Sequence, residues 1–392
     1  MSLTIVKQPP SLVLSGDPVI FYVQTTSVAP NTRITGALYG LSSTAESFIP
    51  DANNQVVFNF SDYLKGLPLI GVTTLGNTAV KWSNGCIAIS FVFLELVDNV
   101  LQGEPLEVIL NVMEGAIPNQ FKNWFYNNYQ SFKNYLIGTP PSTFRPPFLS
   151  LNTNRNFTVF KSTPLRFYWG NLQESEEGGY PSEARLALVL WFSDGDYYQT
   201  EVDVISSVVF GDIVEIPIGY DQLGLQNMID ANKPGKILDY YIVEFIADPP
   251  VTDFAIFSVF IDKRFYQNPR TLFFRNNLNA FEHFILTGLS IQENEYKTLN
   301  VAPDPSSGRP DKITWKVNAN ETIKANTGFI TSSDMHRLAM LLESKEVYEL
   351  INGVLTPIVL HDTKIETVHD DDFIFSADLS WDYAYGNYIE SE

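Results

Sequence analysis

The first two thirds of this chain contain the same β-rich pattern twice, and this internal repeat constrains the fold more than any other feature. Corresponding motifs follow in the same order at a nearly constant separation of about 150 residues, which chance matches would not maintain. The matched positions are Pro18 with Pro164, Arg33 with Arg185, Leu64 with Leu223, Phe93 with Phe245 and Val108 with Ile256. We therefore predict two similar modules in tandem, whose small differences in spacing are loop insertions or deletions.

Both modules read as β-sandwiches. Short runs of β-branched and aromatic residues are bounded by Gly, Pro, Asn or Asp, as in residues 19–25, 32–39 and 87–96. In the second module, Asp194 and Gly195 give a strong hairpin signal. We expect a mostly β protein, with two tandem immunoglobulin- or fibronectin-like β-sandwiches followed by a small α+β domain. The predicted ranges are 1–117 for module 1, 148–267 for module 2 and 268–392 for the C-terminal domain.

The segment between the two modules, residues 118–147, is predicted to be an aromatic helix and a linker. Phe121, Trp124, Phe125 and Phe132 recur at helical spacing, so they form one stripe. Such a stripe is more often part of a core than a platform for a ligand. It is also suited to docking on another chain, so these four residues are the candidate interaction surface.

The C-terminal domain has a different pattern. A hairpin is expected around Asn276 and Asn277, and Asp334 lies in a polar triplet that caps a short helix. Residues 303–310 are rich in Pro, Ser and Gly and are expected to form an exposed loop. Strands are expected to follow the helix and to continue to the end of the domain.

The charge balance excludes some partners. The formal net charge is −20, so we expect no sequence-specific nucleic acid binding, because phosphate affinity needs clustered Lys and Arg. The charge is interpreted mainly as a source of solubility, and the alternative is an acidic lumen past which DNA slides. A single cysteine, Cys86, excludes an internal disulfide framework. No secretion signal or long apolar run is evident, so no membrane insertion is expected.

No motif for catalysis is evident. The sequence has no G-x-S-x-G, phosphate loop or dinucleotide fingerprint. His369 and Asp370 lie in the densest cluster of metal-capable groups, but a polar turn is the better interpretation, as it is for Asp194 and Asp196. We therefore predict no enzyme activity, no catalytic residues, no cofactor and no metal ligand.

Three stretches resemble virion proteins of phages that infect Bacteroidetes. They are residues 5–21, with a Ser-Gly-Asp-Pro turn; residues 268–288, which end in Phe-Ile-Leu-Thr-Gly; and residues 333–385, with a helix followed by Val-Tyr-Glu-Leu and Pro-Ile-Val-Leu. The resemblance implies a tail or baseplate protein built of sandwich modules, without a cofactor or catalytic residues. It implies a chain made in the host cytoplasm that ends in the virion.

The leading hypothesis is a phage virion structural protein that acts by symmetric assembly with copies of itself and with other virion proteins. The alternative is an adhesin or carbohydrate-binding protein, with a host glycan as partner, and a polysaccharide-degrading enzyme is third. Exposed Trp and Tyr on one face would favour sugar binding, whereas apolar patches at module edges would favour assembly.

Overall fold

The structure is a computed structural model of the 392-residue chain. It describes residues 3–9, 12–27, 29–39, 45–65, 75–83, 85–113, 156–171, 181–248, 255–301, 313–361, 374–384 and 387–389. Outside these residues lie the predicted helix and linker at 118–147, the loop at 303–310 and the cluster around Asp370. Strands dominate the described part, which confirms the prediction of a mostly β protein. Within it, no helix has the length and apolar content to cross a membrane.

Module 1 consists of two sheets that face each other across one core. The smaller sheet has the order β1-β3-β6 and the larger has the order β2-β10-β8-β4-β5, with β9 added beside β8. Along β3 and β4, buried residues alternate with more exposed ones, as expected for strands with one face in a core. The bounds are β1 Leu3–Lys7, β2 Leu12–Leu14, β3 Ile20–Thr25, β4 Thr32–Tyr39, β5 Ala45–Phe48, β6 Gln55–Asn59, α1 Ser61–Leu64, β8 Cys86–Val97, β9 Val100–Leu101 and β10 Leu106–Met113.

Module 2 has the same plan. Its larger sheet has the order β11-β17-β16-β13-β14, and its smaller sheet contains β12 and β15. In both modules a short strand pairs in parallel with the last long strand, β2 with β10 and β11 with β17. The bounds are β11 Asn156–Val159, β12 Arg166–Gly170, β13 Glu183–Phe192, β14 Tyr197–Ser206, β15 Ile213–Pro217, α3 Leu225–Asn232, β16 Leu238–Asp248 and β17 Ala255–Ile261.

The two modules also share backbone hydrogen bonds at equivalent places. The amide of Phe60 donates to the carbonyl oxygen of Val19 at 2.9 Å, and the amide of Ile218 donates to that of Leu165 at 2.8 Å. Each bond joins the residue just before one strand of the smaller sheet to the residue just after its neighbour. The identical order of the five strands in the larger sheets and these matching bonds are what the repeat in the sequence predicts.

The cross-strand register corrects one pair of the sequence alignment. The pairs that fix it are Gly36 with Phe93 and Leu186 with Phe245. If Phe93 is equivalent to Phe245, then the alignment of Arg33 with Arg185 is wrong by two residues. A shift of two residues leaves every side chain on the same face of its strand, so the hydrophobic pattern could not reveal it.

A second pair is wrong by one residue. Leu106 lies opposite Phe93, and Ala255 lies opposite Phe245, so Val108 corresponds to Phe257. Phe257 is buried, whereas Ile256, which the alignment chose, is 46% exposed. A one-residue shift reverses the face of the sheet, so the burial itself shows which equivalence is right.

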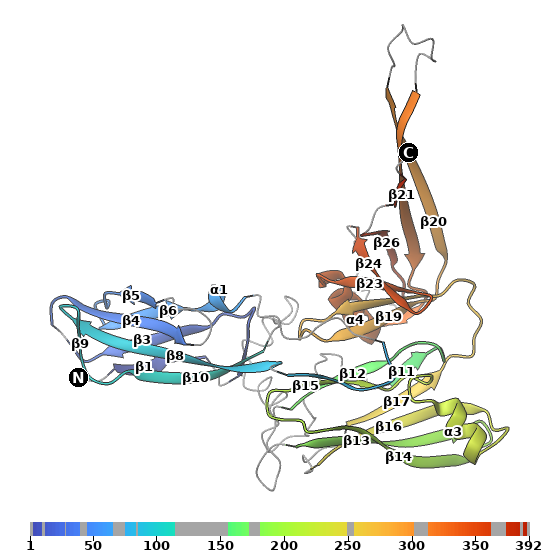
Figure 1. Cartoon of the computed structure of the whole chain (residues 1–392), viewed down its shortest axis with the longest axis horizontal. Helices are drawn as coiled ribbons and strands as arrows, with labels where there is room; N and C mark the ends of the chain where they lie inside the picture. The colour runs from blue at the N-terminus through green and yellow to red at the C-terminus, as the bar shows by residue number, and fades with distance from the viewer. Residues whose placement is uncertain are drawn as a thin grey trace.

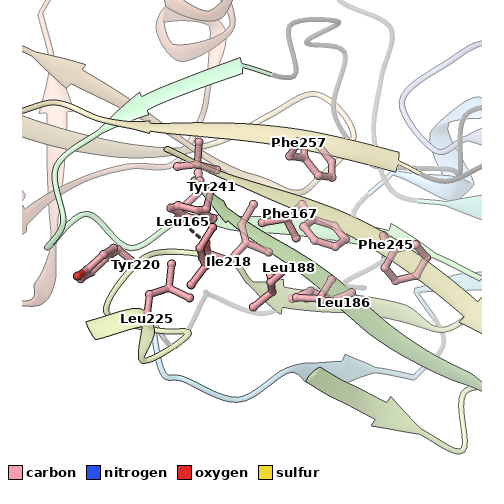
Figure 2. Close-up of a cluster of buried hydrophobic side chains, with 14 of the residues drawn as sticks. Leu165, Phe167, Leu186, Leu188, Ile218, Tyr220, Leu225, Tyr241, Phe245 and Phe257 are labelled. Carbon is pink, nitrogen blue, oxygen red and sulfur yellow. Dashed lines mark hydrogen bonds between the residues drawn. The ribbon is translucent and has the colours of Figure 1, made fainter. Parts of the chain in front are cut away.

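Aromatic side chains fill both cores. In module 1, the ring centroid of Phe21 lies 5.2 Å from that of Phe93. In module 2, Phe167 lies 5.7 Å from Phe245, edge to face, and 5.1 Å from Phe257 (Figure 2). Burying each large apolar side chain contributes about 1.5–3 kcal/mol, so these rings dominate the stability of each sandwich.

The C-terminal domain has one sheet of eight strands, ordered β19-β18-β23-β24-β26-β21-β20 with β27 beside β21. Helix α4 begins at a capping box formed by Thr331 and Asp334 and packs its apolar side on the sheet. The bounds are β18 Arg270–Arg275, β19 Phe281–Leu286, β20 Ser290–Val301, β21 Ile313–Asn326, β22 Ile330–Thr331, α4 Ser332–Glu343, β23 Val347–Ile351, β24 Val354–Leu360, β25 Ile374–Phe375, β26 Asp378–Tyr383 and β27 Asn387–Ile389. The hairpin predicted around Asn276 is confirmed as β18–β19.

Figure 1 shows how the three units are arranged. Module 1 extends to one side, module 2 lies below the C-terminal domain, and β20 and β21 project from that domain as a long arm. One strand crosses between units, because β7 (Val80–Trp82) lies between α1 and β8 of module 1 in the chain but pairs with β15 of module 2.

Candidate interaction site

The joint between the two modules is built from backbone. β7 extends the smaller sheet of module 2, where Ile213 pairs with Trp82. Just after β7, the amide of Cys86 donates to the carbonyl oxygen of Gly211 at 2.9 Å. A side chain on Gly85 would meet that of Ile213, with Cβ only 2.4 Å from its Cδ1. The close approach of module 1 to module 2 therefore requires a residue without a side chain at position 85.

A buried ion pair lies under this joint. Arg166 of β12 and Glu215 of β15 are paired, and their side chains are 2% and 0% exposed. Arg166 also donates to the carbonyl oxygen of Gly76, and Gln222 donates to the same oxygen at 3.1 Å. The segment that leads into β7 is thus held by polar groups of module 2.

A pocket of about 650 Å³ lies where module 2 meets the C-terminal domain. Module 2 contributes the end of β17 and the residues that follow it, including Asp262, Arg264 and Tyr266. The C-terminal domain contributes the turn before β22, with Phe329, and the start of α4, with Arg337. Both units therefore complete one cavity.

Asp262 organises the module 2 side of the pocket. Its backbone amide donates to Val159 at 2.8 Å, which fixes its position beside β11. Arg264 binds its carboxylate through Nε at 3.0 Å and through Nη2 at 2.8 Å, and the Tyr266 hydroxyl donates to it at 3.1 Å. The hydrogen bond from Arg264 lowers the pKa of Asp262, so the carboxylate is charged at neutral pH.

Arg337 organises the opposite side. It donates to the carbonyl oxygen of His283, and its guanidinium lies 3.8 Å from Asp334 and 3.9 Å from Glu282. The imidazole of His283 is buried, with Phe273 at 6.2 Å between ring centroids. Burial, with the charge of Arg337 as a lesser cause, lowers the pKa of His283 to about 3. His283 is therefore neutral, in agreement with a structural histidine.

An aromatic row on the outer face of module 2 ends at this pocket. The row comprises Tyr197, Trp191, Tyr240 and Phe260, one from each of four neighbouring strands. Successive ring centroids are 5.4, 6.0 and 5.2 Å apart. Tyr240 is stacked with both Trp191 and Phe260, whereas Tyr197 is tilted against Trp191 by 34°. Phe260 is the end ring that lines the pocket.

The structure also places the other candidate residues. Phe121, Trp124, Phe125 and Phe132 lie outside the described residues, so the predicted aromatic stripe stays a prediction. Among the described residues, no three His, Cys, Asp or Glu side chains are grouped as metal ligands.

The acidic residues of the second module form ion pairs. Asp194 and Asp196 flank the predicted Asp-Gly turn; Asp196 binds Lys233 at 2.9 Å, and Asp194 pairs with Lys236. These lysines lower the pKa of both carboxyls. Cys86 is buried, and desolvation raises the pKa of its thiol to about 12, which agrees with an inert thiol.

The pocket was missed because its residues come from strands, turns and a helix that are far apart in the sequence. The one local signal was Phe329, a large apolar residue after Gly328 in a polar turn. In the structure its side chain is 88% exposed, and Gly328 has a φ of +74°. An exposed hydrophobic residue at the tip of a glycine turn does not contribute to a hydrophobic core, and it indicates a binding surface.

Comparisons with known proteins give only distant likenesses. No family model and no curated protein matches the chain. Trypsin-activated alpha-2-macroglobulin from Escherichia coli has 9% identity and a TM-score of 0.22 over 99% of this chain and 33% of its own, so the chain spans about a third of it. A tetra-tandem repeat from the extending region of a large adhesion protein has 10% identity and a TM-score of 0.21, over 83% of this chain and 69% of its own. The FN1–FN3 domains of chicken CNTN1 have 10% identity and a TM-score of 0.16, over 83% of this chain and 91% of theirs.

The strand orders define the class of fold on their own. In each module five strands in the shared order, with β9 added in module 1, face a smaller sheet built on two equivalent strands, which is the two-sheet arrangement of immunoglobulin-like sandwiches. The chain is a mostly β protein with such modules and a C-terminal domain of mixed α and β structure.

Proposed function

We propose that this chain is a structural component of a phage virion, from the tail or baseplate, and that it acts by assembling with copies of itself and with other virion proteins. The arm formed by β20 and β21 carries the proposal, because the outer edge of β20 has no partner among the described strands. The sequence resemblance at residues 5–21, 268–288 and 333–385 supplies the link to virions.

Strand β20 is solvated on both faces along its described stretch of residues 291–296. Residues 291–296 of β20 are all exposed, including Ile291 at 48% and Tyr296 at 65%. β26 pairs with β21 only from Thr322 to Asn326 and β27 only from Val317 to Ala319, and no described strand pairs with the outer edge of β20. Two-stranded ribbons without a covered face are only marginally stable in water.

An edge strand with free backbone groups is a template for pairing with another chain. In an assembly, a neighbour would cover the arm by adding a strand to β20 or by packing on its apolar side chains. Such an interface should bury more than about 1,000 Å². The joint between the modules supports the same role, because the pairing of β7 with β15 connects the two modules through one sheet.

The experiment compares two matched substitutions. Tyr296→Lys places a charge on the arm, whereas Val354→Lys places one at a position of equal exposure, 64%, on β24 of the same domain. Native mass spectrometry and sedimentation velocity should show an oligomer for the wild type and for Val354→Lys, and a shift to monomers for Tyr296→Lys. Thermal unfolding should show that both variants remain folded.

Proteomics of purified particles of a phage that encodes the chain tests the virion assignment separately. Recovery of the chain in particles at a stoichiometry set by the particle symmetry is expected. A wild-type chain that stays monomeric at high concentration, or that is absent from particles, would refute the proposal.

A further inference from the structure

The pocket between module 2 and the C-terminal domain has the size and lining of a ligand site. Its volume of about 650 Å³ lies within the range of about 300–1,000 Å³ for small-molecule sites. Two units of the chain form its walls, and interfaces between domains are where such sites are most common.

The charges in the lining are balanced. Asp262 is paired with Arg264, and Asp334 lies near Arg337. No cation or anion of the described lining lacks an opposite charge close by, so the site offers no net attraction to a charged ligand. The polar lining instead includes groups that can both donate and accept hydrogen bonds, such as the hydroxyls of Thr158, Thr287 and Tyr266.

Aromatic rings supply the other half of the chemistry. Phe260, Tyr266 and Phe329 all line the pocket, and Phe329 is almost fully exposed. A ligand that uses both sets of groups must carry hydroxyls at its rim and C–H groups on a flat face. That combination belongs to a pyranose ring, whose faces stack on aromatic side chains while its hydroxyls donate and accept hydrogen bonds.

Comparison of the modules shows that the fold does not require this apolar surface. By the cross-strand register, Tyr240 corresponds to Ala88 and Phe260 corresponds to Asn111 in module 1. Module 1 forms the same sheet with small or polar side chains at these positions. The aromatic row is therefore specific to module 2. It places Phe260 at the pocket, with its ring stacked on that of Tyr240.

We propose that this pocket is a binding site for a neutral oligosaccharide, which stacks on Phe329 and Phe260 and forms hydrogen bonds with the polar groups around Asp262 and Arg264. The proposal goes beyond assembly and does not depend on it, because the pocket and the β20–β21 arm use different residues. A virion component with both would join its neighbours through the arm and bind saccharide through the pocket.

The test is a calorimetric titration of the full chain with three neutral hexasaccharides, namely those of cellulose, amylose and chitin. At least one should bind saturably with a Kd below about 1 mM. Because the site has no net charge, that Kd should change less than about twofold between 0.05 and 0.5 M salt, whereas a charged ligand would weaken with salt.

Two phenylalanines provide a matched pair of variants. Phe329 lines the pocket and is 88% exposed, whereas Phe265 is 90% exposed and does not line it. Phe329→Ala should weaken binding at least about tenfold, and Phe265→Ala should leave the Kd unchanged. Neither side chain is buried, so both variants should fold.

Three results would overturn the proposal. The first is the absence of saturable binding of any of the three sugars at concentrations up to about 10 mM, well above the expected Kd of about 1 mM. The second is an equal effect of the two substitutions, and the third is a Kd that rises steeply with salt. Repeating the titration on Tyr296→Lys separates the two proposals, because loss of assembly should leave saccharide binding intact.

Discussion

The backbone amide of Cys86 donates to the carbonyl oxygen of Gly211 at 2.9 Å, so the first residue of β8 in module 1 is bonded to a loop of module 2. The amide of Gly211 donates in turn to Asn171 at 3.0 Å. Gly211 has a φ of +87°, and a Cβ there would lie 2.6 Å from the carbonyl oxygen of Cys86. At this point the two modules therefore meet through their backbones, and a side chain at position 211 would not fit.

The first prediction concerns this contact. Gly211→Ala should lower the free energy of unfolding by about 2–4 kcal/mol, because the left-handed backbone is strained and the backbone of Cys86 must move away. Gly195→Ala is the matched control, since Gly195 has a φ of +83° and nothing within 4 Å of its Cβ position. It should cost only about 1–2 kcal/mol. Urea denaturation measures both, and equal costs would contradict a tight joint.

The second prediction concerns the buried ion pair. Glu215→Gln should destabilise the protein by about 3–5 kcal/mol, because it leaves the Arg166 charge buried without its partner. Glu201→Gln is the control, since Glu201 and Arg185 form a pair whose side chains are 55% and 45% exposed. It should cost less than about 1 kcal/mol. A small effect of Glu215→Gln would show that water reaches Arg166.

The sequence predicted the elements whose pattern is local. β4 has the bounds that were expected, because buried and exposed residues alternate along it. The polar triplet that ends in Asp334 was predicted to cap α4; the N-cap is Thr331, the residue before the triplet, and Asp334 completes the capping box from the first turn. Burial on alternate faces and a side chain that binds its own helix end are both encoded within a few residues.

Features that join distant parts of the chain were not predicted. β7 has only three residues, and nothing in Val80–Trp82 indicates that its partner is β15. β20 was missed because its Gln, Glu and Asn residues lack the alternation of a strand with one buried face. The pocket depends on how two units pack, which no local pattern contains.

The third prediction uses the repeat. The amide of Val19 is bound by the Ser61 hydroxyl oxygen at 2.9 Å, and the equivalent amide of Leu165 is bound by Gln222 Oε1 at 2.9 Å. Gln222 also holds the carbonyl oxygen of Gly76, so it serves both its own module and the joint.

Ser61→Ala should therefore cost about 1 kcal/mol, the usual worth of one hydrogen bond, and Gln222→Ala about 2–3 kcal/mol. Thermal unfolding of the two variants gives the comparison. Equal losses would mean that the further contacts of Gln222, with the amide of Gly219 at 3.2 Å and with Gly76, add nothing to the stability of the protein.

The last prediction concerns acid stability. Burial lowers the pKa of His283 from 6.5 to about 3 in the folded protein. Between these two values the unfolded chain binds a proton that the folded chain does not, so the stability that depends on neutral His283 is fully present above pH 6.5 and is lost as the pH falls towards 3. The slope from one such group is at most about 1.4 kcal/mol per pH unit.

Carboxylates also titrate in the lower part of this window, so the informative quantity is the difference between two proteins. His283→Gln removes the ionisable group and keeps a polar side chain between Phe157 and Phe273, the rings that flank it. The free energy of unfolding, measured by urea denaturation at intervals from pH 7 to pH 4, should fall less steeply for His283→Gln than for the wild type. Parallel curves would show that His283 is protonated in the folded protein, and that the contact between module 2 and the C-terminal domain admits water at this point.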